Sequence, residues 1–169
     1  MGSYIGIVAI YIEDYNSLNN KMHNIIKLLG KCGISLDNSN ILLDLPIGAS
    51  INTNFFNSSN CLFTVSSNQN YCGLILDIPE NELFNDTYSN IKINEVDGWI
   101  FKLMKMVCNT IQCDYIFCDN EADFLDFKYN CYERSFSTNF SIFINNKNKT
   151  FILNDWNIDG LTSRTVYYK

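Results

Sequence analysis

The chain carries an almost wholly apolar run near its start, Tyr4 to Ile12, which reads YIGIVAIYI. β-Branched and aromatic side chains at consecutive positions are typical of a strand that is covered on both faces of its sheet. A strand with only one buried face would alternate apolar and polar residues instead. The run therefore predicts a central strand.

Two segments follow the helical period instead, residues 15–31 and residues 94–112. Apolar side chains recur three or four positions apart in both, so they lie on one face of a helix. Gly30 or Gly33 can end the first helix, and Asn94 is the expected N-cap of the second. The apolar faces are Leu18, Met22, Ile25, Ile26 and Leu29 in the first helix, and Val96, Ile100, Leu103, Val107 and Ile111 in the second.

Short β-rich segments fill the rest of the chain. Polar residues at 67–70 and 145–149 predict hairpin turns, whereas residues 48–60, rich in Asn and Ser, are expected to form a loop. The expected strands are 41–45, 62–66, 71–78, 115–118, 140–144 and 150–153, with a last edge strand at 165–168.

This order of elements predicts an α+β fold. We expect a mainly antiparallel sheet with the two principal helices packed on one face, and a ferredoxin-like arrangement is the first expectation. A length of 169 residues suits a single globular domain spanning residues 1–169. No apolar run approaches the 18 residues typical of a membrane span, so no membrane association is expected.

The cysteines indicate the compartment. Seven are present, an odd number, and no basic leader of the secretory type precedes them. We therefore expect a cytoplasmic protein with reduced thiols. The spacing of Cys108, Cys113 and Cys118 does not match structural zinc sites, which use pairs two to four residues apart. These cysteines are expected to be small core residues, and no metal or cofactor is predicted.

No catalytic constellation is evident. The single histidine, His23, has no partner at a recognisable spacing and lies off the apolar face of its helix. The segment 119–123, DNEAD, lacks the turn glycine and the terminal glutamate of a calcium loop. A solvated acidic loop is the favoured interpretation, although magnesium at Asp119, Glu121 and Asp123 is an alternative. The chain is not expected to be an enzyme.

The charge distribution is uneven. The chain has 12 basic and 18 acidic residues, a net charge of −6. Residues 77–126 hold eleven acids and three bases, a net charge of −8, and the remainder has seven acids and nine bases, a net charge of +2. An acidic protein disfavours nucleic acid and favours a basic protein partner.

Two acidic segments of this region, residues 79–86 and residues 119–126, also carry aromatic residues, a common composition of interfaces. The alternative is that the acids maintain solubility and the aromatics fill the core. We predict that both segments bind a partner, on one edge of the sheet if their strands are neighbours. The candidate residues are Glu80, Glu82, Phe84, Asp86, Asp119, Glu121, Asp123, Phe124 and Asp126.

The layout resembles that of the immunity proteins of bacterial polymorphic-toxin and contact-dependent growth-inhibition systems. The resemblance rests on the opening strand YIGIVAIYI, the amphipathic helix, the Asn-rich loops and the strand-to-acid segment 115–122. It implies a toxin inhibitor without catalytic residues, which binds one cognate toxin domain in the cytoplasm of the producing cell. A nuclease is the expected toxin, because its positive groove suits an acidic binder.

Two alternatives stay open. One is a small metal-dependent hydrolase that uses Asp119, Glu121 and Asp123. The other is an adaptor module for another basic protein.

Overall fold

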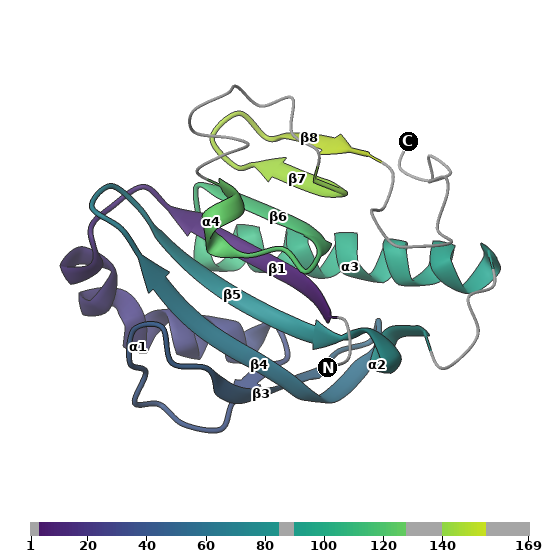
Figure 1. Ribbon diagram of the computed structural model, residues 1–169, viewed down its shortest axis with the longest axis horizontal. Coiled ribbons are helices and arrows are strands. Elements are labelled where there is room, and N and C mark those ends of the chain that lie inside the picture. Colours follow the sequence, from purple (N-terminus) through teal and green to yellow (C-terminus); the bar gives the residue numbers. More distant parts are fainter. Residues whose placement is uncertain (1–3, 85–89, 128–139, 155–169) are drawn as a thin grey trace.

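The computed structural model describes residues 4–84, 90–127 and 140–154, with the backbone alone for residues 84 and 90–97 (Figure 1). Eight strands form one antiparallel sheet in the order β2-β3-β4-β5-β1-β6-β7-β8. The strands are β1 (Tyr4–Tyr11), β2 (Ile34–Leu36), β3 (Ile47–Asn52), β4 (Asn57–Ser67), β5 (Cys72–Pro79), β6 (Tyr115–Asn120), β7 (Ile142–Asn145) and β8 (Thr150–Leu153), and the helices are α1 (Tyr15–Lys31), α2 (Glu80–Phe84), α3 (Asn90–Ile111) and α4 (Phe124–Phe127).

The four central strands and the two long helices form two interleaved β-α-β units. The first unit consists of β1, α1 and β4, and β5 lies between its two strands in the sheet. The second unit consists of β5, α3 and β6, and β1 lies between its two strands. This split β-α-β order is the ferredoxin-like arrangement. The predicted α+β fold is thus confirmed, with β2–β3 and β7–β8 widening the sheet at its two edges.

β1 is buried on both faces, as its unbroken apolar run predicts. Ile5, Ile7 and Ala9 belong to the core under α1 and α3. Val8 and Ile10 belong to a second apolar cluster on the opposite face, which we call the outer face. α1 and α3 both pack on the first face, and α4 lies on the outer one (Figure 1).

The sequence predicts the end of α1 correctly and the start of α3 wrongly. α1 begins after Asp14, whose side chain accepts a hydrogen bond of 2.9 Å from the Ser17 N–H. It ends at Lys31, followed by Gly33 with φ +80°, a conformation that favours glycine. Asn94 is not the N-cap of α3, because the helix already begins at Asn90. Asn is favoured at caps but tolerated inside helices. The residue type alone therefore does not show that Asn90 lies at the start of the helix and Asn94 inside it.

The edge of the sheet departs from the expectation in two places. Residues 48–60 are not a loop, because β3 and the first residues of β4 lie there. Residues 41–45 are not a strand: Leu43 forms a single bridge with Val65, and Asp44 has φ +58°. Near an edge only alternate side chains face the core, so Asn and Ser occupy the other positions and resemble a loop. The short strand β2 was not predicted, and residues 165–168 lie outside the described residues.

Two glycines allow the chain to cross the outer face after β6. A Cβ at Gly6 of β1 would lie 2.1 Å from the Ala122 carbonyl oxygen, and a Cβ at Gly73 of β5 would lie 2.5 Å from Cδ2 of Phe124. Residues 121–124 therefore lie directly on the backbone of β1 and β5. A side chain larger than hydrogen at position 6 would displace this segment.

Gly6→Ala is expected to destabilise the fold by about 2 to 3 kcal/mol, because the added methyl overlaps a backbone oxygen that only a shift of the segment can clear. Gly30→Ala is the matched control, since nothing lies within 4 Å of a Cβ at that helical position. The control should stabilise the fold by up to about 1 kcal/mol. Urea unfolding of the two variants measures both values, and similar stabilities would contradict the close approach at Gly6.

Candidate functional site

The two acidic segments begin at the same end of the sheet. β5 and β6 flank β1 and are both antiparallel to it, with Tyr4 opposite Pro79 and Ile5 opposite Asn120. Both strands therefore end beside the start of β1, about two strand spacings or 10 Å apart. α2 continues directly from β5, and the segment that crosses Gly6 continues from β6.

The predicted residues of the second segment divide into surface and interior positions. Glu121 and Asp123 are exposed, and Asp126 is half-buried. Asp119 is only 8% exposed, and its Oδ1 accepts hydrogen bonds from Ser141 Oγ and from its neighbour's backbone N–H, both at 2.8 Å. Asp119 thus anchors the end of β6 to the residue before β7.

Phe124 is also an interior residue. It is 5% exposed, and its ring lies 5.0 Å from that of Tyr71, centroid to centroid, above Gly73. It fastens the start of α4 to the outer face of the sheet. Its burial leaves it no surface with which to touch a partner in this conformation.

The first segment is described only in part. Glu80 and Glu82 are half-buried, and the Oε1 atom of Glu82 accepts a hydrogen bond of 2.6 Å from Asn60 Nδ2 on β4. This bond turns Glu82 toward β4. The side chain of Phe84 and the whole of Asp86 lie outside the described residues.

Two residues at this end of the sheet were not predicted, Tyr4 and Asp77. The pKa of the Tyr4 hydroxyl is raised by burial and by the surrounding carboxylates of Asp77, Asp123, Glu121 and Asp126. Acids from β5 and from the 121–126 segment therefore surround one tyrosine. We call Tyr4, Asp77, Glu80, Glu82, Glu121, Asp123 and Asp126 the acidic surface.

Asp77 is the acid most constrained by its surroundings. Its Oδ1 is buried, and no hydrogen-bond donor reaches it from the described part of the chain. Burial and then the charge of Asp123 raise its pKa from 3.8 to about 6. The sequence does contain a signal, because Asp77 is the only charged residue of the strand CGLILDIP.

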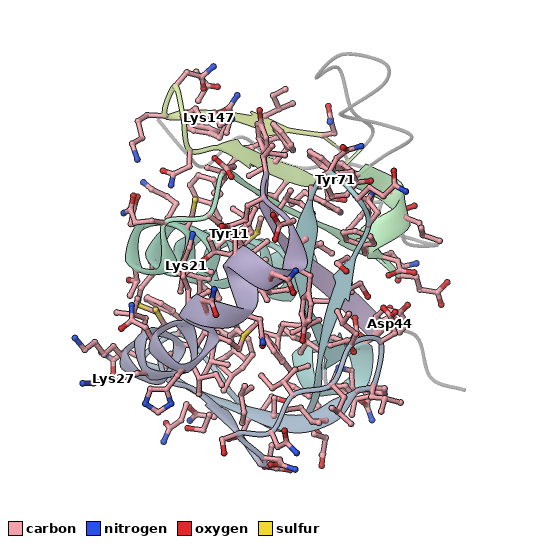
Figure 2. All side chains as sticks on the ribbon, turned by 90° about the vertical axis from the view of Figure 1, so that its left-hand side faces the viewer. Tyr11, Lys21, Lys27, Asp44, Tyr71 and Lys147 are labelled. Atoms are coloured by element: carbon pink, nitrogen blue, oxygen red, sulfur yellow. The ribbon has the colours of Figure 1, made fainter. Side chains whose placement is uncertain are left out.

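The basic side chains that the structure describes lie away from the acidic surface. Residues 32–91 contain six acids and no Lys or Arg, so β2 to β5 and α2 carry no base. The lysines whose side chains are described lie on α1, on α3 and at the β7–β8 turn. Figure 2 shows Lys21 and Lys27 on the helix side of the sheet and Asp44 on the opposite side. Within the described ranges, the strands that carry the acidic surface are thus free of lysine and arginine.

The structure offers little for catalysis by these acids. Asp119 is turned inward, whereas Glu121 and Asp123 are exposed, so the three carboxylates do not converge. Within residues 4–84, 90–127 and 140–154, no group of three His, Cys, Asp or Glu is placed to hold a metal ion. His23 is exposed on α1, and Cys108, Cys113 and Cys118 are buried core residues. What the acidic surface can provide is attraction for a cationic partner.

An acidic surface at one end of the sheet, on a ferredoxin-like scaffold, is suited to binding another protein. Comparison with family models defines the class: the model of Immunity protein 64 (Imm64) matches residues 35–164, which is most of the chain. The chain belongs to this family of immunity proteins, and the resemblance to bacterial immunity proteins is confirmed.

Family membership supports toxin neutralisation as the general role, in a family that is generally non-catalytic. Comparison with curated proteins and with solved structures gives no match. Of the helices in the described ranges, none is both long enough and apolar enough to cross a membrane.

Asp77→Asn tests whether this acid destabilises the fold. A carboxyl whose pKa is raised by folding binds its proton more tightly in the folded state, so stability falls as the pH rises from about 4 to about 6 and then levels off. Asn removes that loss. At pH 7.5 the variant should be more stable by roughly 1 kcal/mol, after allowance for the partial exposure of Asp77.

At pH 3 the variant and the native chain should have nearly the same stability, because this pH lies below both the ordinary pKa of 3.8 and the folded pKa of about 6, so the native carboxyl is largely protonated in both states. Thermal melting at the two pH values measures the difference. A stabilisation that is equal at both pH values would show that the charge of Asp77 is not its cause.

Proposed function

We propose that this chain neutralises a cognate toxin by binding a basic domain of it through the acidic surface. The observation that carries the proposal is the meeting of two acidic segments at one end of the sheet, next to four strands and a helix without any base. Membership of an immunity-protein family supplies the kind of partner. The chain acts by binding alone, in the cytoplasm of the cell that makes the toxin.

A nuclease domain is the proposed target. Its substrate-binding groove must be positively charged to hold phosphates, and an acidic surface of complementary charge accelerates encounter with such a groove. Carboxylates on the inhibitor also compete with phosphates for the same Lys and Arg side chains. The binder therefore occupies the groove or its rim.

Protection of growth is the direct test of this function. The reading frame next to the gene is expressed from an inducible promoter, with and without this chain. The chain should restore growth and form a stable complex with the toxin domain, whereas an unrelated toxin of the same activity should still kill the cells. Binding to a basic protein without any protection would favour the adaptor alternative.

Glu121→Gln with Asp123→Asn tests the role of the acidic surface. The pair removes two negative charges from the surface, and Asn at 123 keeps an oxygen that can accept the hydrogen bond from the Phe124 N–H. The association rate with the toxin domain should fall about three- to tenfold at low salt, and its dependence on salt should become shallower. Stability should change by less than about 0.5 kcal/mol, because both side chains are exposed.

Asn19→Lys with Asn20→Lys is the matched control. It changes the net charge by the same amount at two exposed positions of α1, on the helix side of the sheet. This control is preferable to changes at Glu13 and Asp14, because Glu13 pairs with Lys21 and Asp14 caps α1. Equal losses of association rate in the two double variants would mean that net charge, and not this surface, governs binding.

A further inference from the structure

The outer face of the sheet is covered over only part of its width. α4 and the segment before it lie on β1, β5 and β6, where the second apolar cluster is buried. Over β3 and β4 the described part of the chain places no helix (Figure 1). We call this region, with Gly48, Leu62 and Thr64 on its strands, the open half of the outer face.

The strand register places a leucine between two carboxylates on this open half. Leu62 lies opposite Gly48 on one side and opposite Asp77 on the other. The carboxylate of Asp37 covers Gly48, since a Cβ at that glycine would lie 2.0 Å from Asp37 Oδ2. Neighbouring strands are about 5 Å apart, so an acid flanks Leu62 at about this distance on each side.

Leu62 is an exposed apolar side chain in this acidic setting. It is 46% exposed, on a strand where the alternate residues Cys61 and Phe63 are fully within the core. An exposed leucine alone needs no explanation. Its place between Asp37 and Asp77, on a sheet face that no described helix covers, makes it part of a composite surface.

Among the described residues, the strands of the open half carry no positively charged side chain that could donate a hydrogen bond to these acids. No Lys or Arg occurs in residues 32–91, which supply every strand of this region. The buried Oδ1 of Asp77 has no donor among the described residues. Lys and Arg side chains combine an aliphatic stem, which covers apolar surface, with a cationic head that donates several hydrogen bonds.

We propose that the open half of the outer face receives a lysine or arginine side chain of the toxin domain, with its stem on Leu62 and its cationic head between Asp77 and Asp37. This inference rests on the proposed function and extends its interface from the start of β1 across the sheet to β3. Leu62 and Asp77 are then the residues that hold the bound toxin, whereas Glu121 and Asp123 chiefly attract it.

The occupant follows from the chemistry of the surface. Phosphates of nucleic acids or of anionic lipids would be repelled by Asp37 and Asp77. A purely apolar segment would leave two carboxylates against it without compensation, which is unfavourable. A basic side chain meets both requirements, and desolvated charge pairs beside an apolar contact are typical of the residues that dominate binding.

Dissociation of the complex is the quantity to measure, because contacts made only in the bound state change the dissociation rate more than the association rate. The partner is the toxin domain that passes the growth test. Leu62→Ala and Asp77→Asn should each accelerate dissociation about tenfold or more, and Asp37→Asn should do so by a smaller factor, since Asp37 is more exposed than Asp77. Association rates should change less than in the Glu121 and Asp123 variant.

Two matched controls accompany these variants. Phe151→Ala removes a side chain that is also 46% exposed, on β8 at the far edge of the sheet. Asp44→Asn removes a carboxylate that accepts a hydrogen bond from Ser66 Oγ. Ser66 lies four residues along β4 from Leu62, at a distance of about 14 Å. Both controls should leave the dissociation rate within about twofold of the native value.

A double-mutant cycle identifies the shared contact. If one toxin side chain touches both residues, Leu62→Ala combined with Asp77→Asn should accelerate dissociation by much less than the product of the two single effects. The stability of the free chain distinguishes a lost contact from misfolding. Asp77→Asn should stabilise the free chain while it weakens the complex, whereas misfolding would destabilise the free chain. A weakened complex with a destabilised chain would contradict this account.

The outcomes separate this inference from the proposed function. If the native chain protects cells and all three variants dissociate like the native chain, the toxin does not contact the open half and the inference is wrong, while the proposed function stands. Equal effects of Asp44→Asn and Asp77→Asn would also overturn it, because the effect would then be general. If the native chain neither binds nor protects, both proposals are wrong.

Discussion

The candidate surface depends on the pairing of β1 with β5 on one side and with β6 on the other. Two strands that are both antiparallel to a common neighbour run in the same direction, so their carboxyl ends lie at one end of the sheet. The chain therefore leaves β5 and β6 beside the start of β1, and the acidic residues that follow them meet although α3 separates them in the sequence. Without this pairing the two segments would be unrelated patches of charge.

A close contact then fixes where the second segment lies. The Ala122 carbonyl rests on Gly6, and Phe124 rests on Gly73, so the chain crosses the outer face instead of extending into solvent. Asp77 is left beside this segment with a buried oxygen and a raised pKa. A half-buried carboxylate near other acids destabilises a fold, and such groups are typical of binding sites, where a partner's cation compensates the charge.

Residues with a strong periodic pattern could be predicted from the sequence. The run at Tyr4–Tyr11, the helix at Tyr15–Lys31 and the hairpin turn after Ser66 follow directly from apolar spacing and turn chemistry. The edge strands β2 and β3 could not, because half of their residues face solvent and resemble a loop. Of the residues predicted to bind a partner, Glu121 and Asp123 are exposed, whereas Asp119 and Phe124 are interior; Asp77 and Tyr4 were not identified from the sequence. Burial of a single acid or aromatic depends on neighbours from distant segments, which periodicity does not report.

The sequence by itself determined the buried central strand, the two amphipathic helices, the α+β class and the net negative charge, because each of these follows from the types of residue within a short window. The tertiary structure decided which acids meet, which of them point inward, and that Leu62 lies between Asp37 and Asp77. These relations depend on strand order and register. A shift of one residue in either strand would turn its outward side chains toward the core, and the strand order depends on contacts between segments that are far apart in the sequence.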